Sequence, residues 1–105
     1  MTLVKFLASG NTLIGFELSG HSSANSSDVN GKLVCAAVSS AAYFAANTIT
    51  DVIGENAEIT VNDAELCLKV ISLKPETQAV LKGFKQHMEG LAEQYSQNIK
   101  IISEV

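Results

Sequence analysis

Positive charge is scarce in this chain. It has 7 lysine and arginine residues against 11 aspartates and glutamates, which gives a formal net charge of −4 and a pI of about 5.0. No lysine- or arginine-rich run occurs anywhere in the sequence. Because attraction to a nucleic-acid backbone depends on basic side chains that neutralise phosphates, the composition argues against direct binding of nucleic acid.

Cysteines and long apolar runs are also few. Two cysteines are too few for a disulfide framework, so each needs its own explanation. No apolar run approaches the ~20 residues of a membrane-spanning helix, and the N-terminal segment, interrupted by Lys5, lacks the parts of a signal peptide. With 105 residues, the chain suits one domain spanning residues 1–105. We expect a cytoplasmic protein that does not bind a membrane.

The spacing of apolar residues predicts seven secondary-structure elements. Alternation of apolar and polar residues indicates a hairpin around Ser9–Asn11 and another around Asn62 and Asp63. Steps of three and four indicate two helices, the first ended by Gly54 and the second opened by Pro75. The expected strands are 2–8, 12–19, 57–61, 65–72 and 99–102, and the expected helices are 33–53 and 75–94.

The resulting order, β-β-α-β-β-α-β, predicts a single-domain α+β fold with a mainly antiparallel sheet and two helices. On the second strand, Ile14, Phe16 and Leu18 are expected to share the buried face. Gly83 and Gly90 weaken the second helix, so we expect a close contact with another helix or subunit there.

One stretch of the chain combines a nucleophile with a base. His21 follows the second strand, and Cys35 stands fourteen residues later at the expected start of the first helix, beyond a polar loop at 22–32. A helix N-terminus and a neighbouring imidazolium both stabilise a thiolate. Such a thiolate could attack an acyl carbon, with His21 protonating the leaving amine and backbone amides at the helix start binding the oxyanion. This chemistry is peptide cleavage.

On pattern alone, other interpretations stay open. A cysteine in a first helical turn is more often a small packing residue, and a lone histidine is more often an ordinary loop residue. Cys67 is expected in a half-buried strand row, and His87 on the flank of the second helix. No close spacing supports a metal site built from His21, Cys35, Cys67 and His87. Thiolate hydrolysis needs no cofactor, and a thiol redox sensor would lack a resolving cysteine near Cys35.

At these residues the chain resembles the Prp family of bacterial ribosomal-processing cysteine proteases. The family's Gly-His after the first hairpin and its Val-Cys-Ala-Ala-Val-Ser at a helix start occur here as Gly20-His21 and residues 34–39. Length and element order fit over essentially the whole chain. The resemblance implies a homodimeric α+β endopeptidase with Cys35 as nucleophile and His21 as general base and acid. It also implies the substrate: the N-terminal extension of the twenty-seventh protein of the bacterial large ribosomal subunit, cleaved after a pair of phenylalanines.

One position departs from the family pattern. Members commonly have an aspartate three residues before the cysteine, where this chain has Lys32. Lysine cannot accept a hydrogen bond to orient the imidazole, although its charge would favour a thiolate. Asp28 could replace the missing aspartate, and Ser39, one helical turn beyond Cys35, could support the site. The departure keeps an alternative open, a non-catalytic ribosome-associated protein that binds a peptide without cleaving it.

The implied substrate also gives the polar loop a purpose. With little apolar content, the loop is expected to stay mobile until an extended peptide orders it. An apolar groove beside the first helix would suit the paired phenylalanines, and the acidic chain would tolerate a basic ribosomal substrate.

Overall fold

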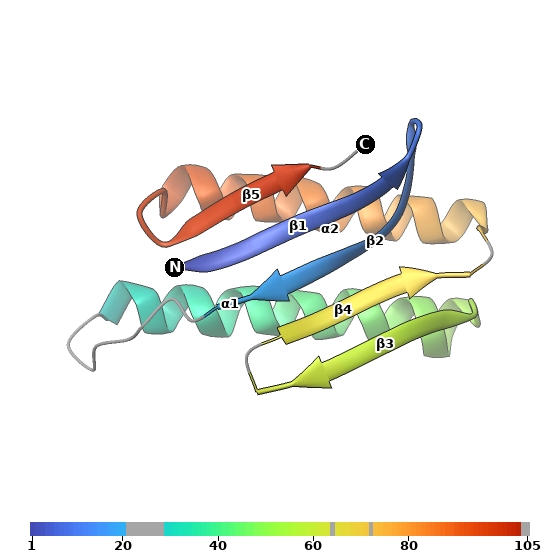
Figure 1. Ribbon diagram of the computed structural model, residues 1–105, viewed down its shortest axis with the longest axis horizontal. Coiled ribbons are helices and arrows are strands. Elements are labelled where there is room, and N and C mark those ends of the chain that lie inside the picture. Colours follow the sequence, from blue (N-terminus) through green and yellow to red (C-terminus); the bar gives the residue numbers. More distant parts are fainter. Residues whose placement is uncertain (21–28, 64, 72, 104–105) are drawn as a thin grey trace.

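The computed structural model describes residues 1–20, 29–63, 65–71 and 73–103. Five strands form one sheet, and the helices cover one of its faces (Figure 1). The elements are β1 (Thr2–Ser9), β2 (Thr12–Ser19), α1 (Val29–Asn47), a π-helical segment η1 (Thr48–Ile53), β3 (Ala57–Asn62), β4 (Glu65–Val70), α2 (Pro75–Gln94) and β5 (Ile99–Ser103). The predicted α+β class and element order are confirmed.

The sheet has the strand order β3-β4-β2-β1-β5. The pairs β3–β4, β2–β4 and β1–β2 are antiparallel, whereas β5 pairs with β1 in parallel. The parallel pair arises because α2 carries the chain back along the sheet before β5 begins (Figure 1). As a consequence, β3 and β5 form the two edges of the sheet.

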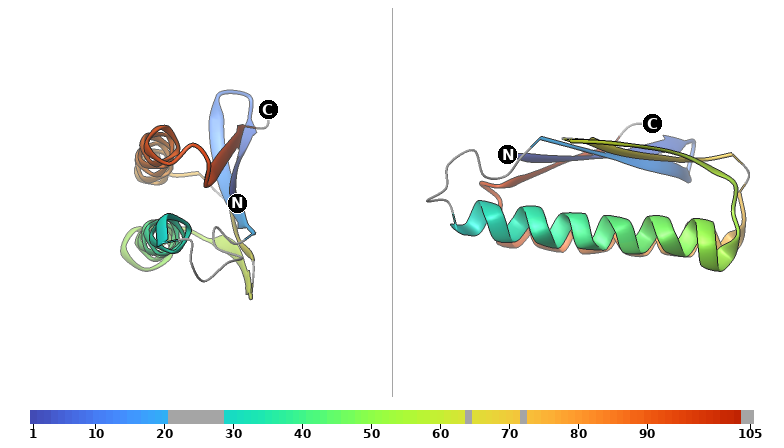
Figure 2. Two further views of the ribbon diagram at one scale, coloured as in Figure 1. Left: turned by 90° about the vertical axis from the view of Figure 1, so that its left-hand side faces the viewer. Right: turned by 90° about the horizontal axis from the view of Figure 1, so that it is seen from below.

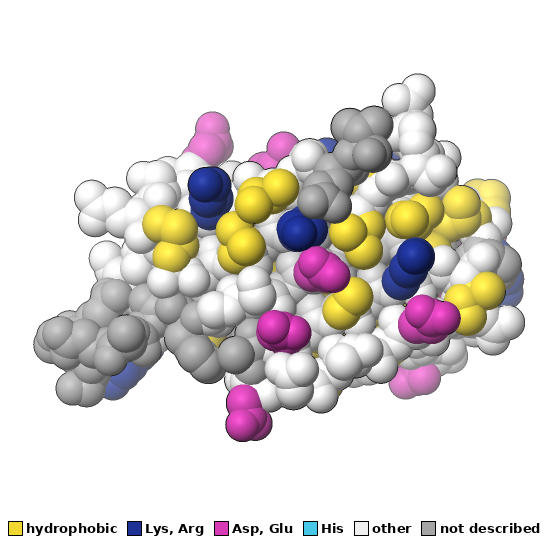
Figure 3. All heavy atoms as spheres, in the orientation of Figure 1, with side chains coloured by type: hydrophobic (Ala, Val, Ile, Leu, Met, Phe, Trp, Pro, Cys, Tyr) yellow, Lys and Arg dark blue, Asp and Glu magenta, His cyan; other side chains and the backbone are white. Residues whose placement is uncertain are grey.

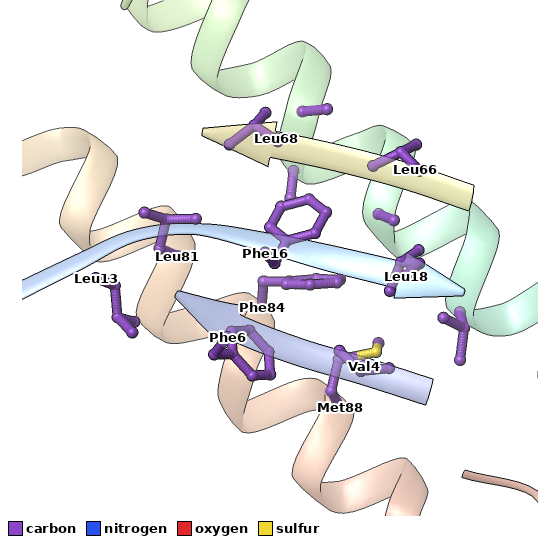
Figure 4. Packing of buried hydrophobic residues seen from close by; sticks show 14 of the residues in the cluster. Val4, Phe6, Leu13, Phe16, Leu18, Leu66, Leu68, Leu81, Phe84 and Met88 are labelled. Atoms are coloured by element: carbon purple, nitrogen blue, oxygen red, sulfur yellow. The ribbon is translucent and has the colours of Figure 1, made fainter. Parts of the chain in front are cut away.

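The molecule has two layers, with α1 and α2 side by side against one face of the sheet (Figure 2). Alternate strand residues point into the space between the layers, including the row of Leu66, Leu68 and Val70 on β4. Phe84 of α2 lies at the centre of this core, with its ring centroid 4.4 Å from that of Phe16 (Figure 4). The opposite face of the sheet carries no helix and displays charged side chains among apolar ones (Figure 3).

A bulge changes the start of β2. Successive residues of β1 pair with Gly15 and then with Leu13, so Ile14 is an extra residue in the ladder. The extra residue shifts the alternation, and Leu13 becomes buried while Ile14 is only half-buried. The predicted buried face of Ile14, Phe16 and Leu18 therefore holds fully only for its last two members.

The first helix begins four residues earlier than predicted, at Val29 rather than at Leu33. Gly31 is the first residue of α1 that is buried against the rest of the protein. Because a glycine carries no apolar side chain, periodicity in the sequence could not detect this first turn. The predicted end is confirmed, since Gly54 has a φ of 78° and donates its N–H to the carbonyl of Ile49.

The length of this helix bears on the expectation that no segment is long and apolar enough to span a membrane. Together, α1 and η1 form a helix of 25 residues, Val29–Ile53, that is long and apolar enough to cross a membrane by length and composition. Its two charged residues, Lys32 and Asp51, stand near its ends. The helix lies along the sheet (Figure 2), and 33% of its most apolar 18-residue stretch is buried. Core helices of soluble proteins satisfy the same criterion, so these properties alone do not indicate a membrane segment.

A buried carboxylate fixes the start of α2. Glu55 is only 3% exposed, and its Oε2 accepts hydrogen bonds from the backbone N–H of Lys74 at 3.0 Å and the hydroxyl of Thr77 at 2.8 Å. Lys74 is the N-cap of α2, so its N–H has no acceptor within the helix, and Thr77 lies in the first turn. Glu55 therefore joins the loop after η1 to the N-terminus of α2.

We expect Glu55→Ala to lower the free energy of unfolding by about 2–3 kcal/mol, because it removes a charged acceptor from two buried or half-buried donors. Urea denaturation followed by circular dichroism would measure the loss. Glu76→Ala is the matched control, since Glu76 is exposed in the same turn and only complements the helix dipole. Equal losses in both variants would contradict a capping role for Glu55.

Candidate active site

A cavity of about 140 Å³ lies between α1 and the ends of β2 and β3. In the ribbon, β2 and β3 both end toward the side of the molecule where α1 begins (Figure 1). Cys35 is in the wall of this cavity. The cavity brings together three segments that are distant in the sequence: one face of α1, the ends of β1 and β2, and the β3–β4 hairpin. Its lining residues are Thr2, Leu18, Ser19, Gly20, Cys35, Val38, Ser39, Tyr43, Val61, Asn62, Asp63, Glu65 and Leu66.

Cys35 lies in the second turn of α1 and is half-buried. The sequence had placed it in the first turn, and this expectation is wrong because α1 begins at Val29. Only the N–H groups at the very start of a helix lack intrahelical acceptors, and Cys35 lies beyond that first turn. The expected oxyanion site at the helix start is therefore about one turn away from the thiol, and the helix dipole is weaker there than at a first turn.

Gly20 shapes the cavity on the sheet side. Its φ is 79°, and a Cβ added to it would lie 2.6 Å from the carbonyl oxygen of Met1. Both the backbone conformation and the space therefore require glycine at this position. His21, bonded directly to Gly20, lies outside the described residues, as do Asp28 and the rest of the polar loop up to residue 28.

Among the predicted supporting residues, Ser39 lines the same cavity as Cys35, one helical turn further along α1. Lys32 is exposed on α1 and is not one of the residues that line the cavity. Residues three apart on a helix are neighbours on its surface, so the Lys32 side chain starts close to Cys35. The structure thus groups Cys35 with Ser39 inside the cavity and leaves Lys32 outside it.

Cys67 has a different environment from Cys35. It alternates with Leu66 and Leu68, which face the helices, so its side chain points to the open face of the sheet. Its Sγ lies 3.6 Å from Oε1 of Glu17 and donates a hydrogen bond to it. Burial raises the pKa of the Cys67 thiol, and the negative charge of Glu17 together with this hydrogen bond raises the pKa further.

We expect alkylation of Cys67 by iodoacetamide to be slow at neutral pH and to accelerate only under alkaline conditions, because a raised pKa leaves less thiolate at any given pH. Glu17→Gln should move this pH profile to lower pH. Mass spectrometry of the Cys35→Ala variant would report on Cys67 alone. Glu58→Gln removes a charge from an exposed site further along the sheet and serves as the control. An unchanged profile in Glu17→Gln would contradict the assigned cause.

The remaining metal and base candidates are not brought together. His87 lies on α2 beside a groove between the two helices, away from the Cys35 cavity. Cys67 points to the sheet face opposite the helices. Within residues 1–20, 29–63, 65–71 and 73–103, no three His, Cys, Asp or Glu side chains are grouped so that they could hold a metal ion.

Several cavity residues were not found by sequence reasoning. Tyr43 stands eight residues after Cys35, two helical turns along the same face of α1, so helical spacing was a usable signal for it. Val61, Asn62 and Asp63 come from the β3–β4 hairpin. Nothing in the local sequence of that hairpin relates it to residue 35, because the contact depends on how α1 lies across the sheet.

Fold and cavity together define a small two-layer α+β protein with a thiol in a surface cavity. A model of the family described as cysteine protease Prp matches residues 1–100. The chain belongs to this family, and the family prediction is confirmed.

Solved structures agree with this assignment at the level of the fold. Two crystal structures of the essential ribosomal processing protease Prp from Staphylococcus aureus, one with a substrate peptide and one with a covalently linked product peptide, match with TM-scores of 0.88 and 0.86. Each is 18% identical, and the match covers 99% of this chain and 100% of the other. A protein from Streptococcus mutans matches with a TM-score of 0.81 and 21% identity, over 99% of this chain and 96% of the other. No curated protein sequence matches the chain.

Proposed function

We propose that the protein is a cytoplasmic cysteine endopeptidase that removes the N-terminal extension of the twenty-seventh protein of the large ribosomal subunit. Cys35 is the nucleophile, and His21 is the general base and acid. The observation that carries this proposal is that Cys35 and Gly20 line one cavity, in a chain that belongs to a cysteine protease family. His21 follows Gly20 directly in the sequence.

The proposed reaction proceeds through a thioester. The Cys35 Sγ transfers its proton to the His21 imidazole and forms a bond with the scissile carbonyl carbon, whose π electrons move onto oxygen. When the tetrahedral intermediate collapses, the C–N bond breaks and the leaving amine takes the proton from His21. His21 then deprotonates a water molecule that attacks the thioester, the C–S bond breaks, and the proton returns to the Cys35 sulfur.

The remaining candidate residues take supporting roles in this proposal. Ser39 lines the cavity, and its hydroxyl is the proposed hydrogen-bond donor to the oxyanion, in place of the first turn of α1. Lys32, three residues before Cys35, favours the thiolate by its charge. Asp28 orients the His21 imidazole in the absence of the family's usual aspartate.

The walls of the cavity suit the proposed substrate. Leu18, Val38 and Leu66 supply apolar surface for a phenylalanine side chain. Asp63 and Glu65, both exposed at the hairpin, supply negative charge for a basic ribosomal peptide. One cavity thus offers a nucleophile, an apolar wall and an acidic rim.

Mass spectrometry of a peptide that carries the ribosomal extension, incubated with the wild-type protein, tests the function. We expect a single scissile bond, located after the paired phenylalanines, and no cleavage of a peptide in which both are replaced by alanine. Cleavage at many unrelated bonds would contradict a processing role. Tight binding of the peptide without any cleavage would instead favour the alternative, a non-catalytic peptide-binding protein, which the departure at Lys32 keeps in consideration.

We also propose that the protein is a homodimer that associates through the outer faces of α1 and α2. A groove of about 590 Å³ runs between these helices, lined by small residues of α1 and by Val80, Gly83, Phe84 and His87 of α2. At its side Phe44 is 73% exposed. From Leu33 to Thr50 the helix carries no charged residue, which is unusual for a surface in permanent contact with water. In a two-fold dimer the same patch of both subunits is covered, so Phe44 and the groove would both be removed from water.

Sedimentation velocity tests the dimer. We expect the wild type to sediment as a dimer and Phe44→Glu as a monomer, because a charge would be buried in the interface. Val52→Glu is the control, since Val52 is 79% exposed but lies outside the groove. A wild type that sediments as a monomer, or a Phe44→Glu variant that stays dimeric, would contradict the proposed interface.

A further inference from the structure

The outer edge of β3 displays a regular set of backbone groups. The Ile71 N–H donates to the carbonyl of Asn56 at 2.9 Å, which fixes the phase of the β3–β4 ladder. In an antiparallel ladder every second residue exchanges hydrogen bonds with the partner strand. Glu58 and Thr60 are therefore bonded to β4, and the N–H and C=O groups of Ile59 and Val61 point to the open edge.

The side chains beside this edge form an incomplete apolar layer. Ile59 pairs with Leu68 and Val61 pairs with Leu66, so both point to the face of the sheet on which the helices lie. They are nevertheless 43% and 52% exposed, because β3 extends beyond the cover of α1. Tyr43 of α1, 48% exposed, lies with Val61 in the wall of the Cys35 cavity. One more strand beside β3 would cover this layer.

The C-terminal end of β3 lies at the Cys35 cavity. β3 runs toward the end of the molecule where α1 begins (Figure 1), and its last residues Val61 and Asn62, followed by Asp63, line the cavity that holds Cys35. A chain that continued the sheet along β3 would therefore pass beside the mouth of that cavity.

We propose that β3 is the docking strand for the substrate. The extended peptide adds to the sheet next to β3, exchanges backbone hydrogen bonds with Ile59 and Val61, and thereby brings its scissile carbonyl to Cys35. This inference rests on the proposed endopeptidase function. Because strand side chains alternate, only one of two adjacent phenylalanines faces the Val61 and Tyr43 side, while its neighbour faces the open side of the sheet.

Charge favours a substrate peptide over a second copy of the chain at this edge. Asp63 and Glu65 are exposed where β3 turns into β4, and β3 itself carries no basic residue. Glu58 is also exposed on β3 and lies opposite Lys69 of β4. Two copies paired through β3 would place these carboxylates near one another, and like charges in such pairs are destabilising. A basic ribosomal peptide would meet them with opposite charge.

The decisive experiment is a scan of backbone N-methylation along the substrate peptide, with kcat/KM measured for the wild-type protein. N-methylation removes one donor and leaves the side chain unchanged. We expect kcat/KM to fall about tenfold or more when the methyl group is on alternate residues whose N–H points to β3. Methylation of the intervening residues, whose N–H points away, is the matched control. Uniform losses, or none, would overturn the proposal.

A substitution on the protein tests the same contact from the other side. Ile59→Pro removes the outward N–H, which makes no bond to β4, and shortens the side chain. Ile59→Val also shortens the side chain but keeps the N–H, so it is the reference for the proline variant. We expect kcat/KM of the proline variant to be about tenfold below that of the valine variant. Alkylation of Cys35 by iodoacetamide should be equal in both variants if the thiol site is intact. Unchanged cleavage by Ile59→Pro, or a change only in oligomeric state, would overturn the docking role.

Failure of this inference can be distinguished from failure of the proposed function. If the wild type does not cleave the unmodified peptide, the endopeptidase proposal fails. The methylation scan is therefore repeated as peptide binding to the Cys35→Ala variant, where alternation of affinity supports β3 as the docking strand and uniform affinity refutes it. If cleavage occurs without alternation, the function stands and the docking strand is wrong.

Discussion

Replacement of Cys35 by alanine is expected to lower kcat/KM for the ribosomal peptide by at least about 10³-fold, because a thioester requires a thiol and the other cysteine of the sequence, Cys67, points to the opposite face of the sheet. The loss should appear in kcat, while affinity for the peptide stays nearly unchanged. Ala36, Ala37, Ala41 and Ala42 already occur in α1, and alanine favours helix formation, so this variant should fold. Single-turnover kinetics with mass detection of both products would measure the effect.

The second cysteine provides the matched control. Cys67→Ala removes a thiol that is half-buried like Cys35 but lies on the opposite face of the sheet. The kcat/KM of this variant should remain within a few-fold of the wild type. His21→Ala should lose activity nearly as completely as Cys35→Ala, and the double variant should be no worse than either alone, since the two residues act as one unit. Cleavage that persists in Cys35→Ala would exclude Cys35 as the nucleophile.

The largest effect on stability is expected at Gly15. A Cβ built on this residue would lie 2.0 Å from the carbonyl oxygen of Leu68, a backbone atom of the neighbouring strand β4. Gly15→Ala must therefore separate β2 from β4 in the middle of the sheet, next to the bulge at Ile14. We expect a loss of about 3–4 kcal/mol, toward the upper end for a single substitution. The melting temperature should fall by more than about 10 °C.

Gly90→Ala is the control for this prediction. Gly90 lies in α2, and a Cβ added there meets nothing within 4 Å. This variant should gain about 0.5–1 kcal/mol, because alanine restricts the unfolded chain and favours the helix. Calorimetry of both variants should thus show shifts of opposite sign. A Gly15→Ala protein as stable as the wild type would contradict the close approach of β2 to β4.

The open space around Gly90 also bears on the predicted close contact of α2 at Gly83 and Gly90. Two glycines seven residues apart suggested a close contact of α2 with another helix or subunit. Neither Gly83 nor Gly90 has an atom within 4 Å of an added Cβ, so no close contact of that kind exists among the described residues. Gly83 instead lines the groove between α1 and α2.

The sequence by itself determined the order of the elements and most of their limits. Strand alternation, helical spacing, Gly54 and Pro75 are local signals, and each acts within a few residues. The bulge at Ile14 and the early start of α1 were not predicted, because neither produces such a local signal. The register of β2 depends on pairing with β1, and the first turn of α1 is buried through a glycine.

Some features of the candidate site were likewise predictable from the sequence, and others were not. Sequence alone supplied the reactive residues, because Gly20-His21 and the segment around Cys35 form a motif within twenty residues. Only the tertiary structure decided that Cys35 stands in the second turn of α1, that Ser39 and Tyr43 share its cavity, and that the β3–β4 hairpin forms the opposite wall. The reason is physical: chemistry depends on side-chain type, which the sequence states, whereas a cavity depends on how a helix lies across a sheet, which long-range packing of the whole core determines.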